Sequence, residues 1–225
     1  MLHVENIAFR YPKSDYGLQI EEFACEAGRT IAIVGPSGCG KTTFLNLSAG
    51  VLRPSRGSIR IGETDLRTLG ESAAAAFRLA EVGLIFQEFE LVNHLTVRDN
   101  ILLPLHLGLP LSPEDRGALI ERARNLAEQT GIGKLWKERP HHLSQGERQR
   151  VAICRALAID PRLVLADEPT GNLDPSNKDK VLDLMIEFAR GDGRALVVAT
   201  HDVELLDSFD AVVQFDELNQ FKLQS

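Results

Sequence analysis

The sequence is poor in cysteine and has no hydrophobic run that could cross a membrane. Its three cysteines, Cys25, Cys39 and Cys154, are an odd number without metal-site spacing, so we expect free thiols in a reducing compartment rather than disulfides. The most apolar stretch, residues 101–111, is interrupted by proline, histidine and glycine. It also falls short of the roughly 20 residues that a membrane-spanning helix needs. The first residues lack a basic region followed by an apolar stretch, so we expect no secretory signal.

Positive charge is also scarce. The formal net charge is -7, whereas a protein that binds nucleic acid without sequence specificity needs a basic face. Three arginines do cluster at Arg148, Arg150 and Arg155, and we interpret them as a solvated or ion-paired helix face rather than a nucleic-acid site. With 225 residues, 44% of them hydrophobic, the chain can bury the core of one large α/β domain or of a core with a subdomain.

Strand and helix patterns alternate along the chain, which predicts a mainly parallel sheet with helices on both faces. Residues 2–11 and 17–24 alternate apolar and polar, as antiparallel strands do. Residues 212–215 and 221–223 are expected to close the fold as a hairpin. The remaining expected strands are 31–34, 58–61, 82–86, 163–166 and 195–199, and the expected helices are 42–49, 176–190 and 202–208.

The middle of the chain has a different character. Between residues 95 and 130 apolar residues recur at helical spacing, and Ser112-Pro113-Glu114 is typical of a helix start. We therefore predict a mainly helical insertion over residues 88–150. Residues 1–87 and 151–225 would form the α/β core, with an antiparallel β subdomain near the N-terminus.

A phosphate-binding loop follows the expected strand at residues 31–34. Its sequence is Gly35-Pro36-Ser37-Gly38-Cys39-Gly40-Lys41-Thr42, and a helix is expected directly after it. The glycines allow backbone N–H groups to surround a phosphate, and the helix N-terminus adds partial positive charge. Lys41 is predicted to reach the β- and γ-phosphates and the Thr42 hydroxyl to hold Mg²⁺. A glycine-rich turn without ligand is the plain alternative.

Two carboxylates end the buried strand at residues 163–166. Asp167 and Glu168 would be costly to place there without a cation or a reacting water. Asp167 is predicted to bind Mg²⁺, through water, and Glu168 to act as the general base that polarises the attacking water. The alternative is an ordinary strand end that carries two acids.

A second loop also opens a helix. In Leu143-Ser144-Gln145-Gly146-Glu147 the serine hydroxyl, the free N–H groups and the helix dipole form a second anion-binding surface. Ser144 and Glu147 also have the spacing of a capping box, and both interpretations can hold together. One ATP is not easily enclosed by both loops of one small domain. We therefore predict that two copies of the chain hold ATP between them.

This ordered set resembles the nucleotide-binding subunits of ATP-binding cassette (ABC) transporters over essentially the whole chain. The resemblance implies a P-loop NTPase (RecA-like) α/β core, ATP hydrolysis with Mg²⁺, and a homodimer of cassettes. Leu143 to Glu147 resembles the family's signature motif, with Gln145 where glycine is commoner. By that resemblance Ser144 and Gly146 contact the γ-phosphate of ATP bound to the partner protomer.

The resemblance assigns further residues by their place in the set. Gln87 resembles the Q-loop glutamine, His201 the switch histidine and Asp174 the D-loop aspartate, although a lone glutamine or histidine is more often a plain surface or strand-end residue. Tyr11 would stack on adenine, with a core tyrosine as the alternative. The expected catalytic residues are Glu168, His201, Gln87 and Lys41, and the metal site is Thr42, Gln87 and Asp167. The expected ATP-binding residues are Tyr11, Gly35, Pro36, Ser37, Gly38, Cys39, Gly40, Lys41, Thr42 and Thr43, with Ser144, Gln145, Gly146 and Asp174 acting in trans.

The resemblance also implies a membrane partner. The loop Glu88 to His94 is expected to contact an integral membrane subunit at the cytoplasmic face of the inner membrane, although its apolar residues could instead pack the helical insertion. The segments 167–174 and 91–100 and the turn at 103–105 resemble the subgroup of ATPases of lipoprotein release, macrolide export and cell division. The expected absence of a C-terminal regulatory domain favours the same subgroup. The rivals are a soluble ATPase acting on DNA, a small-molecule kinase and a degenerate scaffold. No nucleic-acid partner is expected.

Overall fold

The computed structural model describes residues 1–12, 16–191 and 193–221. The first sheet is antiparallel and contains β1 (Leu2–Arg10), β2 (Gly17–Cys25), β4 (Arg56–Ile61) and β5 (Thr64–Asp65), in the order β2-β1-β4-β5. Leu2 lies opposite Cys25 on one neighbour and Ile61 on the other, and all three are buried. The predicted antiparallel strands at the N-terminus are therefore confirmed.

The second sheet is entirely parallel and carries the site. Its strands are β3 (Thr30–Val34), β6 (Val82–Ile85), β7 (Leu163–Asp167), β8 (Ala195–Ala199) and β9 (Ala211–Gln214), in the order β6-β7-β8-β3-β9. Because the strands are parallel, their carboxyl ends meet at one edge, which is where α/β sheets bind ligands. The expected parallel-sheet α/β fold is confirmed.

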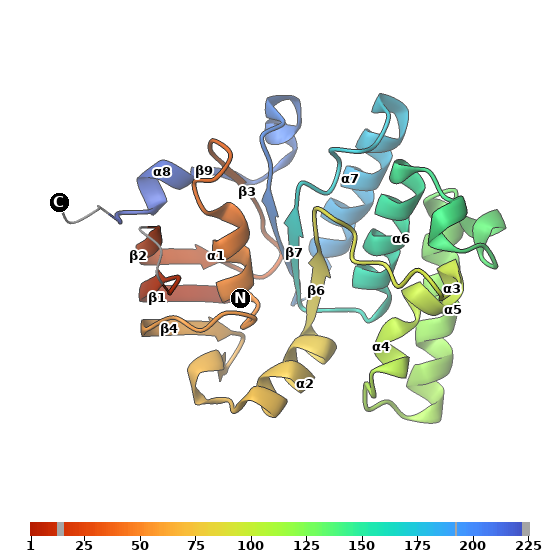
Figure 1. Ribbon diagram of the computed structural model, residues 1–225, viewed down its shortest axis with the longest axis horizontal. Coiled ribbons are helices and arrows are strands. Elements are labelled where there is room, and N and C mark those ends of the chain that lie inside the picture. Colours follow the sequence, from red (N-terminus) through yellow and green to blue (C-terminus); the bar gives the residue numbers. More distant parts are fainter. Residues whose placement is uncertain (13–15, 192, 222–225) are drawn as a thin grey trace.

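The parallel sheet separates two hydrophobic cores. Leu163 and Leu165 of β7 face α1 (Lys41–Ser48) and the antiparallel sheet, whereas Val164 and Ala166 face α6 (Gln145–Ala158) and α7 (Pro175–Ala189). Successive side chains of a strand point to opposite faces, so one apolar run supplies both cores. Figure 1 shows α1 between the two sheets and α6 and α7 on the opposite side of the parallel sheet.

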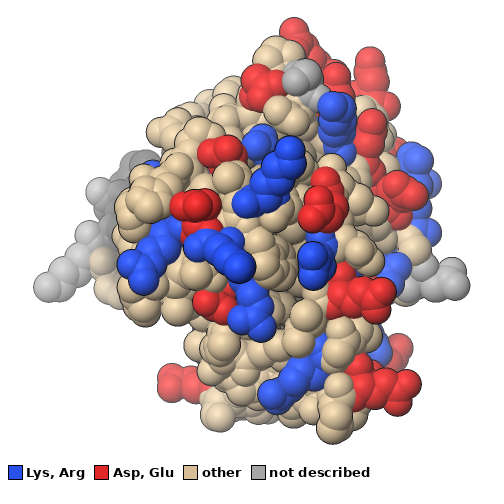
Figure 2. Space-filling model, turned by 90° about the vertical axis from the view of Figure 1, so that its right-hand side faces the viewer, with Lys and Arg blue, Asp and Glu red and all other residues tan. Residues whose placement is uncertain are grey.

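Between β6 and β7 the chain is helical. After α2 (Glu71–Glu81) and β6 come α3 (Val97–Ile101), α4 (Leu103–His106) and α5 (Pro113–Gln129), followed by the 3₁₀ helices η2 (Gly133–Leu135) and η3 (Pro140–His142). Ser112 caps α5 by accepting from the Asp115 N–H at 3.1 Å, as its sequence predicts. Basic and acidic side chains lie next to one another over this face of the molecule (Figure 2). Residue 150, the predicted end of the helical insertion, lies inside α6.

Two details differ from the sequence predictions. The prediction of a closing hairpin is wrong, because β9 pairs in parallel with β3. Phe215, predicted to end a hairpin strand, instead begins the short helix α8 (Phe215–Leu218), where its ring is buried. Of the predicted second hairpin strand, only Phe221 is described, and it is not part of a strand. The predicted helix at 202–208 is the 3₁₀ helix η4 (Val203–Ser208). Among the described residues, no helix is both long enough and apolar enough to span a membrane.

Candidate functional site

The phosphate loop joins β3 to α1 at the carboxyl edge of the parallel sheet. Gly38 and Gly40 have φ angles of 80° and 114°, which glycine tolerates far better than other residues. No side chain caps α1, whose N-cap is Gly40, so its first N–H groups are not committed to a capping residue. The Lys41 side chain bends back over the loop, and its Nζ donates to the carbonyls of Gly35 (2.7 Å) and Pro36 (3.1 Å).

Asp167 lies at the end of β7, beside the first turn of α1. Its carboxylate is buried and accepts a hydrogen bond from the Thr42 hydroxyl at 2.5 Å. Burial raises the pKa of the Asp167 carboxyl, the Thr42 hydrogen bond opposes the rise, and the neighbouring Glu168 adds to it. A hydroxyl and a carboxylate that converge in this way fit the oxygen ligands that Mg²⁺ prefers.

Glu168 has an unusual backbone conformation that turns its side chain toward β8. Its φ is 49°, and its N–H donates to the Ala199 carbonyl at 2.9 Å. The carboxylate oxygens contact His201 Nδ1 at 2.7 Å and the Thr200 hydroxyl at 3.3 Å. Strained residues of this kind cluster at functional sites. The strain and the two contacts fix the direction of a carboxylate at the mouth of the site.

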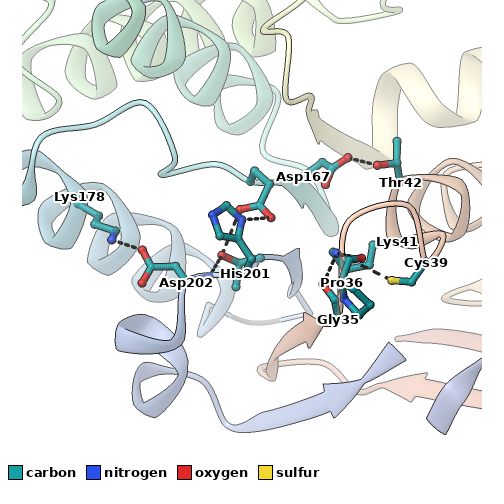
Figure 3. A network of polar contacts seen from close by, with 11 residues as sticks. Gly35, Pro36, Cys39, Lys41, Thr42, Asp167, Lys178, His201 and Asp202 are labelled. Atoms are coloured by element: carbon teal, nitrogen blue, oxygen red, sulfur yellow. Dashed lines mark hydrogen bonds and ion pairs between the residues drawn. The ribbon is translucent and has the colours of Figure 1, made fainter. Parts of the chain in front are cut away.

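The residues around His201 are anchored on both sides (Figure 3). The Asp202 N–H donates to the Thr200 hydroxyl at 3.1 Å, and the Asp202 carboxylate forms an ion pair with Lys178 of α7. The segment that carries His201 is thus tied both to the end of β8 and to α7.

These residues surround one pocket of about 350 Å³. Its lining consists of Tyr16, Ser37, Gly38, Gly40, Lys41, Thr42, Thr43, Gln87, Asp167, Glu168 and His201. The structure thus brings together every residue predicted to be catalytic or to bind the metal in cis. Gln87 enters the pocket from the segment after β6.

Of the two tyrosines near the loop, Tyr11 was considered in the sequence analysis and Tyr16 was not. The Tyr16 hydroxyl donates to the Cys39 carbonyl at 2.9 Å, and burial raises the pKa of Tyr16 to about 12. Nothing local in the sequence marks this residue, because its partner is 23 positions away. Tyr11 is 37% exposed rather than a core residue, and its hydroxyl lies 3.2 Å from that of Thr43. Its ring packs edge to face with that of Phe9, with the ring centroids 4.8 Å apart.

The residues predicted to act in trans lie outside this pocket. Ser144 and Glu147 form a full capping box, in which Glu147 Oε2 accepts from the Ser144 N–H (2.8 Å) and from its hydroxyl (2.9 Å). Gly146 faces residues 172–174, the predicted D-loop, since a Cβ there would lie 3.1 Å from the Asn172 carbonyl oxygen. Ser144, Gln145 and Asp174 are exposed. Within the described chain, the signature and D-loop residues form a surface of their own.

Two of the three arginines on α6, Arg148 and Arg155, do not form the solvated or ion-paired face that we predicted. Arg155 donates to the carbonyls of Glu90 (2.6 Å) and Phe89 (2.7 Å). Arg148 Nε donates to the Pro140 carbonyl at 2.8 Å. Both side chains reach loops that only the tertiary fold places beside α6.

A larger, apolar groove lies on the other side of Gln87. It has a volume of about 660 Å³ and is bordered by α2, β6, α4 and α6. Leu79, Phe86, Leu103 and Leu107 contribute apolar surface, and Leu107 is 64% exposed. Of the predicted docking loop Glu88 to His94, Glu90 lines the groove.

Comparisons with known proteins find relatives over most of the chain. A protein-family model described as ABC transporter matches residues 18–171. An uncharacterised ABC transporter ATP-binding protein of Mycobacterium tuberculosis is 39% identical over 216 residues, which are 95% of this chain and 64% of that protein. The chain thus spans less than two thirds of that relative's length.

Two further matches cover their proteins more fully. The lipoprotein-releasing system ATP-binding protein LolD of Cereibacter sphaeroides is 43% identical over 189 residues, which are 84% of this chain and 83% of that protein. The dimeric, post-hydrolysis structure of the ATP-binding cassette MJ0796, bound to ADP and Pi, matches with a TM-score of 0.84 and 29% identity, covering 100% of both chains.

Proposed function

The chain belongs to the ABC transporter family, and from this premise we propose that it binds ATP with Mg²⁺ and hydrolyses ATP to drive a membrane partner. One observation carries the proposal: the Glu168–His201 pair faces the same pocket as Lys41 and the Thr42–Asp167 pair. A base, a cation for phosphate and a set of metal ligands are therefore adjacent. That combination supports phosphoryl transfer to water.

Each residue has a role that follows from its position. Lys41 exchanges its two loop carbonyls for phosphate oxygens, and the first N–H groups of α1 bind the same phosphates. Thr42, Asp167 and Gln87 would hold Mg²⁺, which when bound neutralises charge on the phosphates. Glu168 takes a proton from the attacking water. His201 holds the carboxylate of Glu168 in line with that water.

Two copies of the chain would complete each site. Ser144 and Gly146 of one protomer would contact the ATP held by Lys41 of the other, which suits their place outside the pocket and the exposure of Ser144. The similarity to the dimeric cassette MJ0796, which carries ADP and Pi, supports this arrangement. Hydrolysis or product release would then reopen the dimer.

The partner is proposed to be an integral membrane subunit at the cytoplasmic face of the inner membrane. The apolar groove supports this, because it lies between the proposed core (residues 1–87 and 151–225) and the proposed helical unit (residues 88–150). The loop Glu88 to His94 borders it through Glu90. The similarity to LolD favours a partner of the lipoprotein-release type, and the comparisons give no support to an ATPase acting on DNA. Purification of the tagged chain from gently solubilised membranes tests the docking, and recovery without any membrane protein would refute it.

The variant Glu168→Gln tests the proposed chemistry. It keeps the shape of the side chain but removes the base, so we expect ATP to bind, a closed dimer to accumulate and turnover to fall by at least about 100-fold. Turnover is measured as phosphate release and dimerisation by size-exclusion chromatography with ATP and Mg²⁺. Glu187→Gln, an exposed change on α7, is the matched control. A wild-type chain that releases no phosphate, or an ATP-loaded Glu168→Gln that stays monomeric, would refute the proposal.

A further inference from the structure

Arg155 binds a strained turn that follows Gln87 directly. Phe89 and Glu90 are consecutive residues with φ angles of 62° and 49°, a conformation that non-glycine residues rarely adopt. The turn is tight, since the Phe89 N–H donates to the Phe86 carbonyl at 3.1 Å. Both carbonyls of the strained pair accept from the two terminal nitrogens of the Arg155 guanidinium, at 2.7 and 2.6 Å. One planar fork therefore holds both residues in place.

The turn contributes residues to both the nucleotide pocket and the apolar groove. Gln87, at its start, lines the nucleotide pocket. Phe86, Glu90 and Arg155 line the apolar groove. A change in the turn thus alters both the position of Gln87 and the wall of the groove.

Arg155 comes from α6, the helix that begins at the signature serine. Arg155 is partly buried, which lowers the pKa of its guanidinium, and the two carbonyl oxygens supply hydrogen bonds to it. Because α6 is one continuous helix from Gln145 to Ala158, the fork joins the turn rigidly to the element that carries Ser144.

We propose that Arg155 is a positioning residue for hydrolysis that acts through Gln87, and that it links the wall of the apolar groove to the nucleotide pocket. The inference rests on the proposed function. Without the fork, the strained pair relaxes, and Gln87 leaves the place from which it contacts the metal or its water. An occupant of the groove that pulls on Glu90 would have the same effect. ATP binding itself depends on the phosphate loop and is not altered.

A double-mutant cycle tests the inference in the full-length chain. We expect Arg155→Met to lower kcat about 10-fold with the KM for ATP changed less than about twofold, and Arg155→Lys, which keeps the charge and one donor nitrogen but not the planar fork, to recover part of the loss. In a Gln87→Ala background, Arg155→Met should lower kcat by less than about twofold, because the residue through which it acts is already gone.

Arg122→Met is the matched control for a merely structural arginine. Arg122 donates to the Ala158 carbonyl at the far end of α6, at 3.0 Å, away from the pocket. This variant should lower the melting temperature without changing kcat. The inference is overturned if Arg155→Met leaves kcat unchanged, or lowers it equally in the wild-type and Gln87→Ala backgrounds, while the wild type hydrolyses ATP. A wild type without hydrolysis refutes the proposed function instead, and the inference with it.

Discussion

Helices α1 and α6 both begin with a glycine-containing loop suited to anions, but only α6 is closed by its own side chains. The N-cap of α1 is Gly40, which offers no capping group. The N-cap of α6 is Ser144, whose hydroxyl accepts from the Glu147 N–H at 3.3 Å while Glu147 bonds back to Ser144. The first N–H groups of α1 can thus donate to a phosphate. At the start of α6, the capping box already accepts from backbone N–H groups, and it adds the carboxylate of Glu147.

The two helix ends also differ in how far their neighbouring residues are buried. Around α1, Lys41 and Asp167 are buried, and the pocket is assembled within one chain. At α6, Ser144 is exposed and Gly146 packs against the D-loop. A capped, exposed helix end is stable on its own and adds to a site only when a partner brings the anion. We therefore infer that the α1 end forms a nucleotide pocket within one chain. The α6 end would then contribute to the pocket of a partner chain.

The strongest test of this comparison mixes two inactive variants. Lys41→Ala disables the α1 end, and Gly146→Asp disables the α6 end, because it places a second carboxylate in the first turn of α6, where it repels phosphate, and a Cβ 3.1 Å from the Asn172 carbonyl oxygen. Each alone should lose at least about 100-fold in turnover. After random pairing, half the dimers are mixed and each has one intact site, so about a quarter of the wild-type rate should return if sites work independently.

Phosphate release and ATP retained on the mixed dimers are the two measurements. Mixing wild type with Lys41→Ala in the same ratio is the control for subunit exchange. If every functional group acted within one chain, the mixture of the two variants would not hydrolyse ATP, and the comparison between the helix ends would fail.

A smaller effect, on the stability of the nucleotide-free protein, is expected from Asp167→Asn. This variant tests the buried carboxylate beside the start of α1. The pKa of Asp167 is raised by burial, so its ionised form is disfavoured in the folded chain. As pH rises from the unfolded pKa through the folded one, stability is therefore lost, and at pH 7 the charge is a cost. Asparagine keeps the acceptor for Thr42 without the charge. We expect the nucleotide-free melting temperature at pH 7 to rise by roughly 2–4 °C, equivalent to about 1 kcal/mol.

The gain should disappear at a pH below the unfolded pKa, where Asp167 is protonated in both states. Asp183→Asn, an exposed change on α7, should alter the melting temperature little at either pH. A lower melting temperature for Asp167→Asn at pH 7 would show that the carboxylate stabilises the pocket, contrary to the raised pKa.

The parts of the molecule that the sequence predicted are those with local signals. The phosphate loop and the strand ending in Asp167 are contiguous motifs whose place on a parallel sheet follows from periodicity. The contacts of Tyr16 and Arg155 were missed, because each bonds a carbonyl of a remote loop and any residue supplies a carbonyl. The sequence analysis placed Phe215 in a strand because it is apolar and follows the apolar strand β9 directly. No residue next to it signals that a helix starts there.

The subtlest prediction concerns Glu147, whose carboxylate both caps α6 and opposes an anion there. Glu147→Gln keeps an acceptor for the N–H and hydroxyl of Ser144, so the melting temperature should change little. Removing the charge should favour an incoming γ-phosphate, and we expect ATP-driven dimerisation to tighten by about 2–5-fold, as an interaction of 0.3–1 kcal/mol at a helix end implies. Analytical ultracentrifugation over a range of ATP concentrations, in the Glu168→Gln background, measures the effect. Glu121→Gln, an exposed change on α5, is the control that removes a charge elsewhere. Equal or weaker dimerisation by Glu147→Gln would mean that the cap already leaves the end of α6 open to phosphate, and the contrast with α1 would then lie in burial alone.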